Sequence, residues 1–147
     1  MFEDIKRISR NAKRLSLNSL VKDIISIDFI EHLIINLNTR DQLFNEGIDI
    51  NSKVVGYYAM TYRGIDGHTK ERNKHYDFLD SGEFFKSFRV KAVNGGFIIS
   101  AKNEKMSDTP QVNNGEDLIG LTKENLRVLA EQIQPYLKQM ILNKILQ

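Results

Sequence analysis

Residues 84–102 read FFKSFRVKAVNGGFIISAK, two runs rich in β-branched and aromatic residues separated by an Asn-Gly-Gly turn at 94–96. Asn-Gly supplies the positive backbone angles that a tight antiparallel turn needs, so the stretch predicts a β-hairpin near 87–101. Lys91 is expected to face water, whereas four apolar residues are expected to face the core, namely Val90, Ala92, Phe97 and Ile99. Because a lone hairpin is marginally stable, we expect a further strand, for which VVGYYAM at 54–60 is the candidate.

A long helix, or two in tandem, is expected before the hairpin. Asn18 or Ser19 can cap it, a break is expected near Ser26 to Asp28, and Gly47 suits a left-handed helix stop. Its apolar residues keep close to one helical face and span more than a strand's length. These residues are Leu20, Ile24, Ile27, Ile30, Ile34, Leu37 and Phe44.

A further helix is expected after the hairpin, running to the end of the chain. Thr122 is the predicted cap, and Leu121 with Leu126 is placed as a hydrophobic staple. Its predicted buried stripe is Leu126, Leu129, Ile133, Leu137, Met140, Ile141 and Ile145. The sequence therefore predicts one α+β domain over 1–147, with N-terminal helices and a C-terminal helix packed on a small antiparallel sheet.

The N-terminal segment, about 2–15, predicts a short amphipathic helix that is a candidate for a separate arm. Its apolar stripe is Phe2, Ile5, Ile8, Ala12 and Leu15, and its basic face carries Lys6, Arg7, Arg10, Lys13 and Arg14. We interpret the basic face as a solvated surface over a core. The alternative is an arm that touches nucleic acid or an acidic partner.

Two polar segments, about 60–77 and 102–117, are predicted to be loops, because they contain turn-forming residues and no sustained period. Ordered loops of that length in a small domain usually have a role, such as contacting a neighbour.

Composition excludes several classes of protein. The chain has 147 residues, enough for a single core, with ordinary hydrophobic and charged fractions of 41% and 27%. It has no cysteine, which excludes disulfides, thiolate zinc sites and cysteine nucleophiles. The net charge of +2 is too mild to indicate nucleic-acid binding by itself. The sequence shows neither a signal-peptide core nor the ~18 apolar residues of a membrane span, so neither is expected.

Carboxylates and imidazoles gather in one stretch and raise the possibility of metal-dependent hydrolysis. The candidates are Asp66, His68, His75, Asp77, Asp80 and Glu83. Their spacing matches no established ligand signature, so we interpret them as part of a solvated loop. The Ser81-Gly82 pair lacks the flanking glycine and preceding strand of a nucleophile elbow.

The segment 78–88, FLDSGEFFKSF, is better explained as local structure. Asp80 or Ser81 can cap a single helical turn beginning at Gly82, which places Phe84 and Phe88 on one face. Ser87 then leads the chain into the hairpin, so the segment is predicted to anchor aromatic rings in the core.

This segment also resembles the TG-x-L-x-x-S signature of tailed-phage virion-morphogenesis proteins, which are neck, tail-completion or head-tail joining proteins. With LNTRDQLFNEGID before it and DLIGLTKENLRVLAEQI after it, the chain is similar to versions from phages and prophages of Bacteroides-type bacteria over about 37–137. The residues that carry the motif are Leu79, Asp80, Ser81, Gly82, Phe84, Ser87 and Phe88.

The resemblance implies a structural protein rather than an enzyme, with no catalytic residue, cofactor, small-molecule substrate or membrane partner. It implies a homo-oligomeric ring around the DNA channel, located in the virion neck or tail after assembly in the host cytoplasm. Portal, neck or tail subunits are the implied partners, and DNA is present only as possible channel contents. The candidate contact residues are Arg63, Arg72, His75, Glu83 and Lys86. The alternatives are a nucleic-acid-binding module that uses the basic N-terminal helix and, third, a metal-dependent hydrolase.

Overall fold

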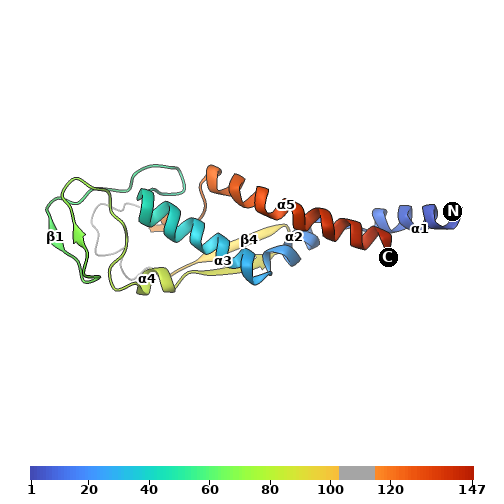
Figure 1. The fold of residues 1–147 in the computed structure, drawn as a ribbon, viewed down its shortest axis with the longest axis horizontal. Helices are drawn as coiled ribbons and strands as arrows, with labels where there is room; N and C mark the ends of the chain where they lie inside the picture. The colour runs from blue at the N-terminus through green and yellow to red at the C-terminus, as the bar shows by residue number, and fades with distance from the viewer. Residues whose placement is uncertain (103–114) are drawn as a thin grey trace.

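The computed structural model describes residues 1–102 and 115–147 and shows an elongated α+β molecule (Figure 1). Its helical elements are α1 (Phe2–Lys13), α2 (Leu17–Ile25), α3 (Asp28–Asn36), the π-helix η1 (Leu37–Glu46), α4 (Glu83–Lys86), the 3₁₀-helix η2 (Gly115–Leu118) and α5 (Lys123–Leu146). Its strands are β1 (Tyr62–Arg63), β2 (Thr69–Lys70), β3 (Arg89–Val93) and β4 (Gly96–Ser100). Most of the loop predicted at 102–117 lies outside the described residues.

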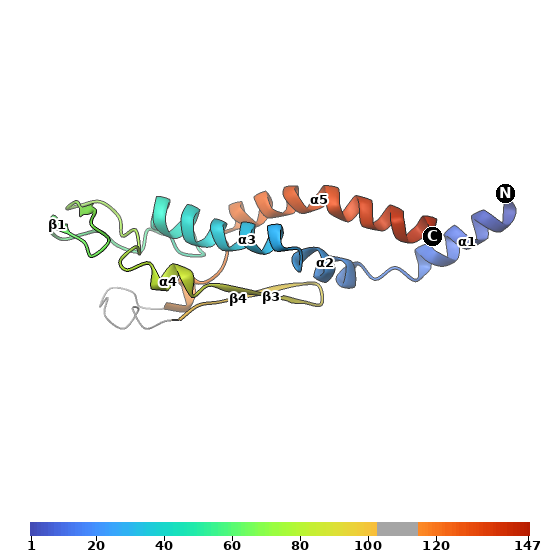
Figure 2. The same cartoon turned by 60° about the horizontal axis from the view of Figure 1, so that its bottom comes forward.

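The elements are stacked side by side along the long axis. The β3–β4 hairpin lies against α2 and α3, and α5 packs on the other side of these two helices (Figure 2). Both termini lie at one end of the molecule and β1 lies at the other (Figure 1). None of the helices in the described ranges is both long and apolar enough to cross a membrane.

The helical run before the first strand is divided as predicted. Ser26 and Ile27 separate α2 from α3, and Gly47 ends η1 with a φ of 64° in the left-handed region. The predicted cap is wrong: Ser16, not Asn18 or Ser19, precedes α2, and its Oγ accepts from the Ser19 amide at 3.3 Å. Ser16 caps the helix because its backbone is extended there, as an N-cap requires.

The hairpin is confirmed, with β3 and β4 antiparallel and Val93 paired with Gly96. Gly95 has a φ of 83°, and its amide donates to the Asn18 carbonyl at 3.1 Å, so the turn docks on the start of α2. The expected third strand at 54–60 is wrong, because within residues 1–102 and 115–147 the hairpin sheet consists of β3 and β4, and 54–60 does not pair with either. The hairpin is instead stabilised by packing of its apolar face on the helices.

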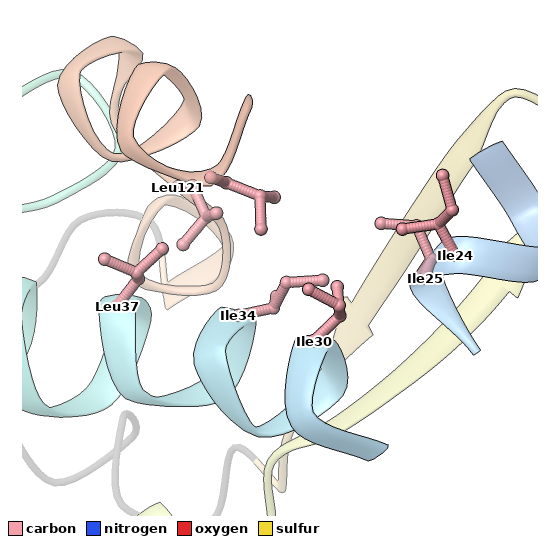
Figure 3. Close-up of a cluster of buried hydrophobic side chains, with 7 residues drawn as sticks. Ile24, Ile25, Ile30, Ile34, Leu37 and Leu121 are labelled. Carbon is pink, nitrogen blue, oxygen red and sulfur yellow. The ribbon is translucent and has the colours of Figure 1, made fainter. Parts of the chain in front are cut away.

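A main apolar cluster joins α2, α3 and α5 (Figure 3). It consists of Ile24, Ile25, Ile30, Ile34, Leu37, Leu121 and Leu129. The predicted inward residues of the hairpin pack against it, which confirms their assignment: Val90, Ala92, Phe97 and Ile99.

The start of α5 is capped as predicted, because the Thr122 Oγ1 accepts from the Asn125 amide at 3.2 Å. Leu126 is exposed, so it is wrong as a member of the buried stripe. Leu121 turns into the apolar cluster beside Leu37 (Figure 3).

Two fully buried amide side chains of η1 hold the segment that leads into α5. Asn38 Nδ2 donates to the Leu118 carbonyl at 3.0 Å, and its Oδ1 accepts from the Gly120 amide at 2.8 Å. Gln42 Nε2 donates to the Gly120 carbonyl at 2.9 Å, and its Oε1 accepts from the Thr122 amide at 2.9 Å. These bonds fix the direction in which α5 leaves η2.

The N-terminal helix forms as predicted but ends at Lys13, and none of its residues is buried. It contacts α5 rather than the core, and Asn11 Nδ2 donates to the Ile145 carbonyl at 3.5 Å. In both views its first turns extend beyond the C-terminal end of α5 (Figures 1 and 2).

Candidate contact surface at the tip

Residues 54–79 form the end of the molecule opposite the termini, and we call this segment the tip (Figure 1). Tyr57 faces His75 in an isolated bridge, and Tyr62–Arg63 pairs with Thr69–Lys70. These pairs share one antiparallel register, so the tip is an irregular hairpin. The run at 54–60, rich in strand-forming side chains, therefore pairs at its start with Ile48, through Val54, and then within the tip, through Tyr57, rather than with the β3–β4 sheet.

A buried lysine in the second arm of the tip bonds to the turn and to the end of its own arm. The Lys70 side chain is 3% exposed, and its Nζ donates to Asp66 Oδ2 at 2.6 Å and to Asp77 Oδ2 at 2.8 Å. It also donates to the Leu79 carbonyl at 2.9 Å. All three ammonium protons thus have acceptors, which is what burial of a charge requires.

The electrostatics of this cluster favour the charged forms. The hydrogen bond from Lys70 is the largest cause that lowers the pKa of Asp66, and it outweighs the opposing effect of burial. Burial by itself lowers the pKa of Lys70, but its bonds to Asp66 and Asp77 raise that pKa on balance. The cluster is therefore an ion network at neutral pH.

Tyrosine rings extend the same network across the tip. The Tyr58 hydroxyl donates to Asp77 Oδ1 at 2.9 Å, and burial is the main cause that raises the pKa of Tyr58. Its ring meets those of Tyr62 and Tyr76 edge to face, with centroids 5.8 and 5.0 Å apart. Polar and aromatic contacts together give the tip a defined shape.

The residues considered for metal binding are arranged differently from a metal site. Asp66 and Asp77 already accept from Lys70, the His68 side chain is exposed, and His75 Nδ1 hydrogen-bonds to the Tyr76 carbonyl. Across residues 1–102 and 115–147, no group of three or more His, Asp or Glu side chains could hold a metal ion. Sequence reasoning missed Lys70; its only signal was the four-residue spacing from Asp66.

The outer surface of the tip presents large apolar side chains to solvent. They are Val54, Tyr57, Met60, Tyr62 and Ile65, the last of which is 82% exposed. Arg63 and Arg72 are exposed on the same segment. Tyr, Met and Arg are enriched in protein interfaces, so this composition is typical of a protein interface and makes the tip a candidate contact surface. We call the five apolar side chains the tip surface.

The motif next to the tip forms the single helical turn that the sequence predicted, but the predicted cap is wrong, because the N-cap is Gly82 and neither Asp80 nor Ser81 occupies that position. Helix α4 begins at Glu83, one residue later than expected, because Gly82 takes a left-handed conformation with a φ of 87°. The Ser81 Oγ accepts from the Glu83 amide at 3.4 Å. Phe84 and Phe88 are buried with their rings 5.2 Å apart, in a second apolar cluster with Leu43 and Leu118.

Ser87 joins this turn to the end of the hairpin. Its Oγ donates to the Phe84 carbonyl at 2.6 Å and accepts from the Lys102 amide at 2.9 Å. Since the Leu79 carbonyl accepts from Lys70, the motif connects the tip at one end to the hairpin at the other. Asp80 is half-buried in this connection.

The candidate contact residues fall in three places. Arg63 and Arg72 lie exposed on the tip, and Glu83 with Lys86 forms an exposed ion pair of 3.6 Å on α4. His75 is half-buried, in the arm that pairs with Tyr57. The sequence analysis predicted these charged residues as contacts, but it did not predict that the apolar side chains of the tip surface are exposed beside them.

The chain was compared with protein-family models, with curated proteins and with solved structures. No protein-family model matches the chain, and no curated protein or solved structure matches it.

Proposed function

We propose that this chain is a structural, non-enzymatic subunit of a tailed-phage virion, in the neck or tail. It assembles into a homo-oligomeric ring and docks other virion proteins through its tip. The observation that carries the proposal is the tip surface, a set of exposed Tyr, Met and Ile side chains on a segment held by a buried ion network. The resemblance of residues 78–88 to the phage signature supports the class of protein.

The apolar side chains of the tip are both exposed to solvent and held in place, and both properties favour docking. Exposed apolar patches on soluble proteins commonly mark interaction sites. Binding costs less conformational entropy when the contacting side chains are already positioned, as Tyr62 is by its contact with Tyr58. The Lys70 network supplies that order without burying Tyr57 or Ile65, which leaves both available to a partner.

A nucleic-acid-binding module is the second candidate, and the charges of α1 favour it. Lys6 pairs with Glu3 and Arg7 with Asp4, but Arg10 has no carboxylate partner within the described residues. The same holds for Lys13 and Arg14, the next basic residues of this segment. Binding to a DNA duplex that weakens steeply with salt would favour this candidate.

The proposed function is tested by producing the full chain alone and together with the proteins encoded beside it. Mass photometry and negative-stain electron microscopy should show rings, and pull-down should recover a virion partner. Tyr57→Ser with Ile65→Ser should weaken partner capture at least ~10-fold, the loss expected from two interface anchors. The matched control is Ile98→Ser, an exposed apolar residue on β4. Monomers with every partner, or full capture by the double variant, would refute the proposal.

A further inference from the structure

The end opposite the tip carries a second exposed apolar surface. It is formed by Phe2 and Ile5 of α1 and by Leu142 and Leu146 of α5, which we call the basal face. Phe2 is 78% exposed, whereas Ile8, on the same stripe of α1, is half-buried. The stripe is therefore open at Phe2 and Ile5 and partly covered at Ile8 and Leu15, whereas the small Ala12 between them is exposed.

Charge is distributed unevenly between this end and the rest of the chain. Residues 1–15 carry five basic and two acidic side chains, and residues 138–147 carry two basic and no acidic ones. Residues 16–137 carry 14 basic against 17 acidic side chains. The basal end is thus net positive and the body of the molecule is net negative.

This asymmetry decides between the possible occupants of the basal face. Two basal faces meeting each other would bring like charges together, which opposes a symmetric contact. A nucleic acid would use the cations but not Phe2 and Ile5. The body of another copy offers an acidic group for the cations and an apolar side chain for the apolar residues. Helix α3 begins with exposed Asp28 and Phe29, and the Phe29 side chain is 56% exposed.

We propose that the basal face of one copy docks on the acidic α2–α3 side of the next copy, around Asp28 and Phe29. The two surfaces differ, so the contact is heterologous and can repeat from copy to copy until a ring closes. This inference rests on the proposed ring and names the contact that builds it, whereas the tip remains free for other virion proteins.

The test uses sedimentation velocity of the full chain at low salt and at about 0.5 M salt, where exposed charges are screened. Phe2→Ser with Ile5→Ser is the basal variant, Asp28→Lys with Phe29→Ser is the acceptor variant, and Leu126→Ser is the control. Wild type and control should self-associate, more weakly at high salt. Each double variant should associate at least ~10-fold more weakly. Circular dichroism checks that all variants are folded, as expected for exposed positions.

Mixing the two variants gives the sharpest result. The basal variant keeps its acceptor and the acceptor variant keeps its basal face, so the mixture should form one-to-one dimers and stop there. Assembly of the basal variant at wild-type strength, a monomeric wild type, or no dimer in the mixture would each overturn the inference. So would binding of the basal face to phosphatidylglycerol vesicles with self-association unchanged in its variant.

The outcomes separate the two proposals. If basal variants assemble normally while tip variants lose partner capture, only the inference fails. If the heterologous contact is confirmed while tip variants capture partners as well as wild type, the proposed docking function fails and the inference stands.

Discussion

Replacing Lys70 with Met tests whether the tip is held by its buried ion network. The substitution keeps a long flexible side chain but removes the ammonium group that Asp66 and Asp77 share. Two carboxylates then lie close together without a counter-charge, one of them 6% and the other 21% exposed. The tip should open locally while the apolar clusters of the body stay intact.

The expected magnitude follows from the burial of the two carboxylates. Removing one partner of a buried ion pair costs about 3–5 kcal/mol. The partial exposure of Asp77 favours the lower end, so we expect about 3 kcal/mol. At 1.4 kcal/mol per tenfold change, the opening equilibrium of the tip should rise about 100-fold.

Hydrogen exchange with mass spectrometry measures this opening directly. The amides of Tyr58 and Gly64, which donate to the Lys74 and His68 carbonyls, should lose about 100-fold in protection. The protection of the α3 amides against exchange should stay the same. Adding Asp66→Asn and Asp77→Asn to Lys70→Met removes the stranded charges and should restore much of the protection. If the tip amides of Lys70→Met exchanged at the wild-type rate, or if the α3 amides lost as much protection as the tip amides, the reasoning would be refuted.

Three further predictions concern the body, the hairpin and pH. Gln42→Met leaves the buried Thr122 amide and Gly120 carbonyl without these partners, so urea unfolding should show a loss of about 3 kcal/mol. Gly95→Ala should cost about 1–2 kcal/mol, from the positive φ and from a Cβ placed 3.1 Å from an Asn18 oxygen. The control Gly67→Ala has a similar φ but open space, so a cost equal to that of Gly95→Ala would contradict the contact. For pH, the folded pKa of Asp66 is lowered, so its contribution is present above the unfolded value of 3.8 and is lost as pH falls through the folded pKa. The near-ultraviolet dichroism of the tyrosines should therefore decline below about pH 4, and a signal unchanged at pH 2 would argue against the network.

The parts of the fold that the sequence predicts are those with local signals. The Asn-Gly turn fixes the hairpin, Gly47 ends the helical run, and Thr122 caps α5, each through its own backbone geometry. The hydrogen bonds from Asn38 and Gln42 to residues about 80 positions away have no such signal. An amide inside a helical pattern is usually read as solvent-facing, and only the tertiary structure shows that it is buried.

The tip was harder to predict because its order comes from a buried cation. Lysine is rarely buried, so the acidic residues around Lys70 suggested a metal or a solvated loop. The β-rich run at 54–60 suggested a strand of the main sheet for want of another partner. Its true partners are Ile48, which bridges Val54, and the arm around His75, whose sequence is polar and has no alternation.

The way the tip is stabilised bears on what it can do. A tip held by an apolar core would have to bury Tyr57, Met60 and Ile65, and it would then offer little to a partner. Because the Lys70 network and the Tyr58 contacts hold the backbone, these side chains remain exposed at small entropic cost on binding. The basal face at the other end differs in charge and in its apolar residues, so the two ends are suited to different partners. A subunit with two dissimilar ends is polar along its long axis. In the proposed ring, whose contacts are heterologous, such subunits all point the same way and present their tips to the same partner.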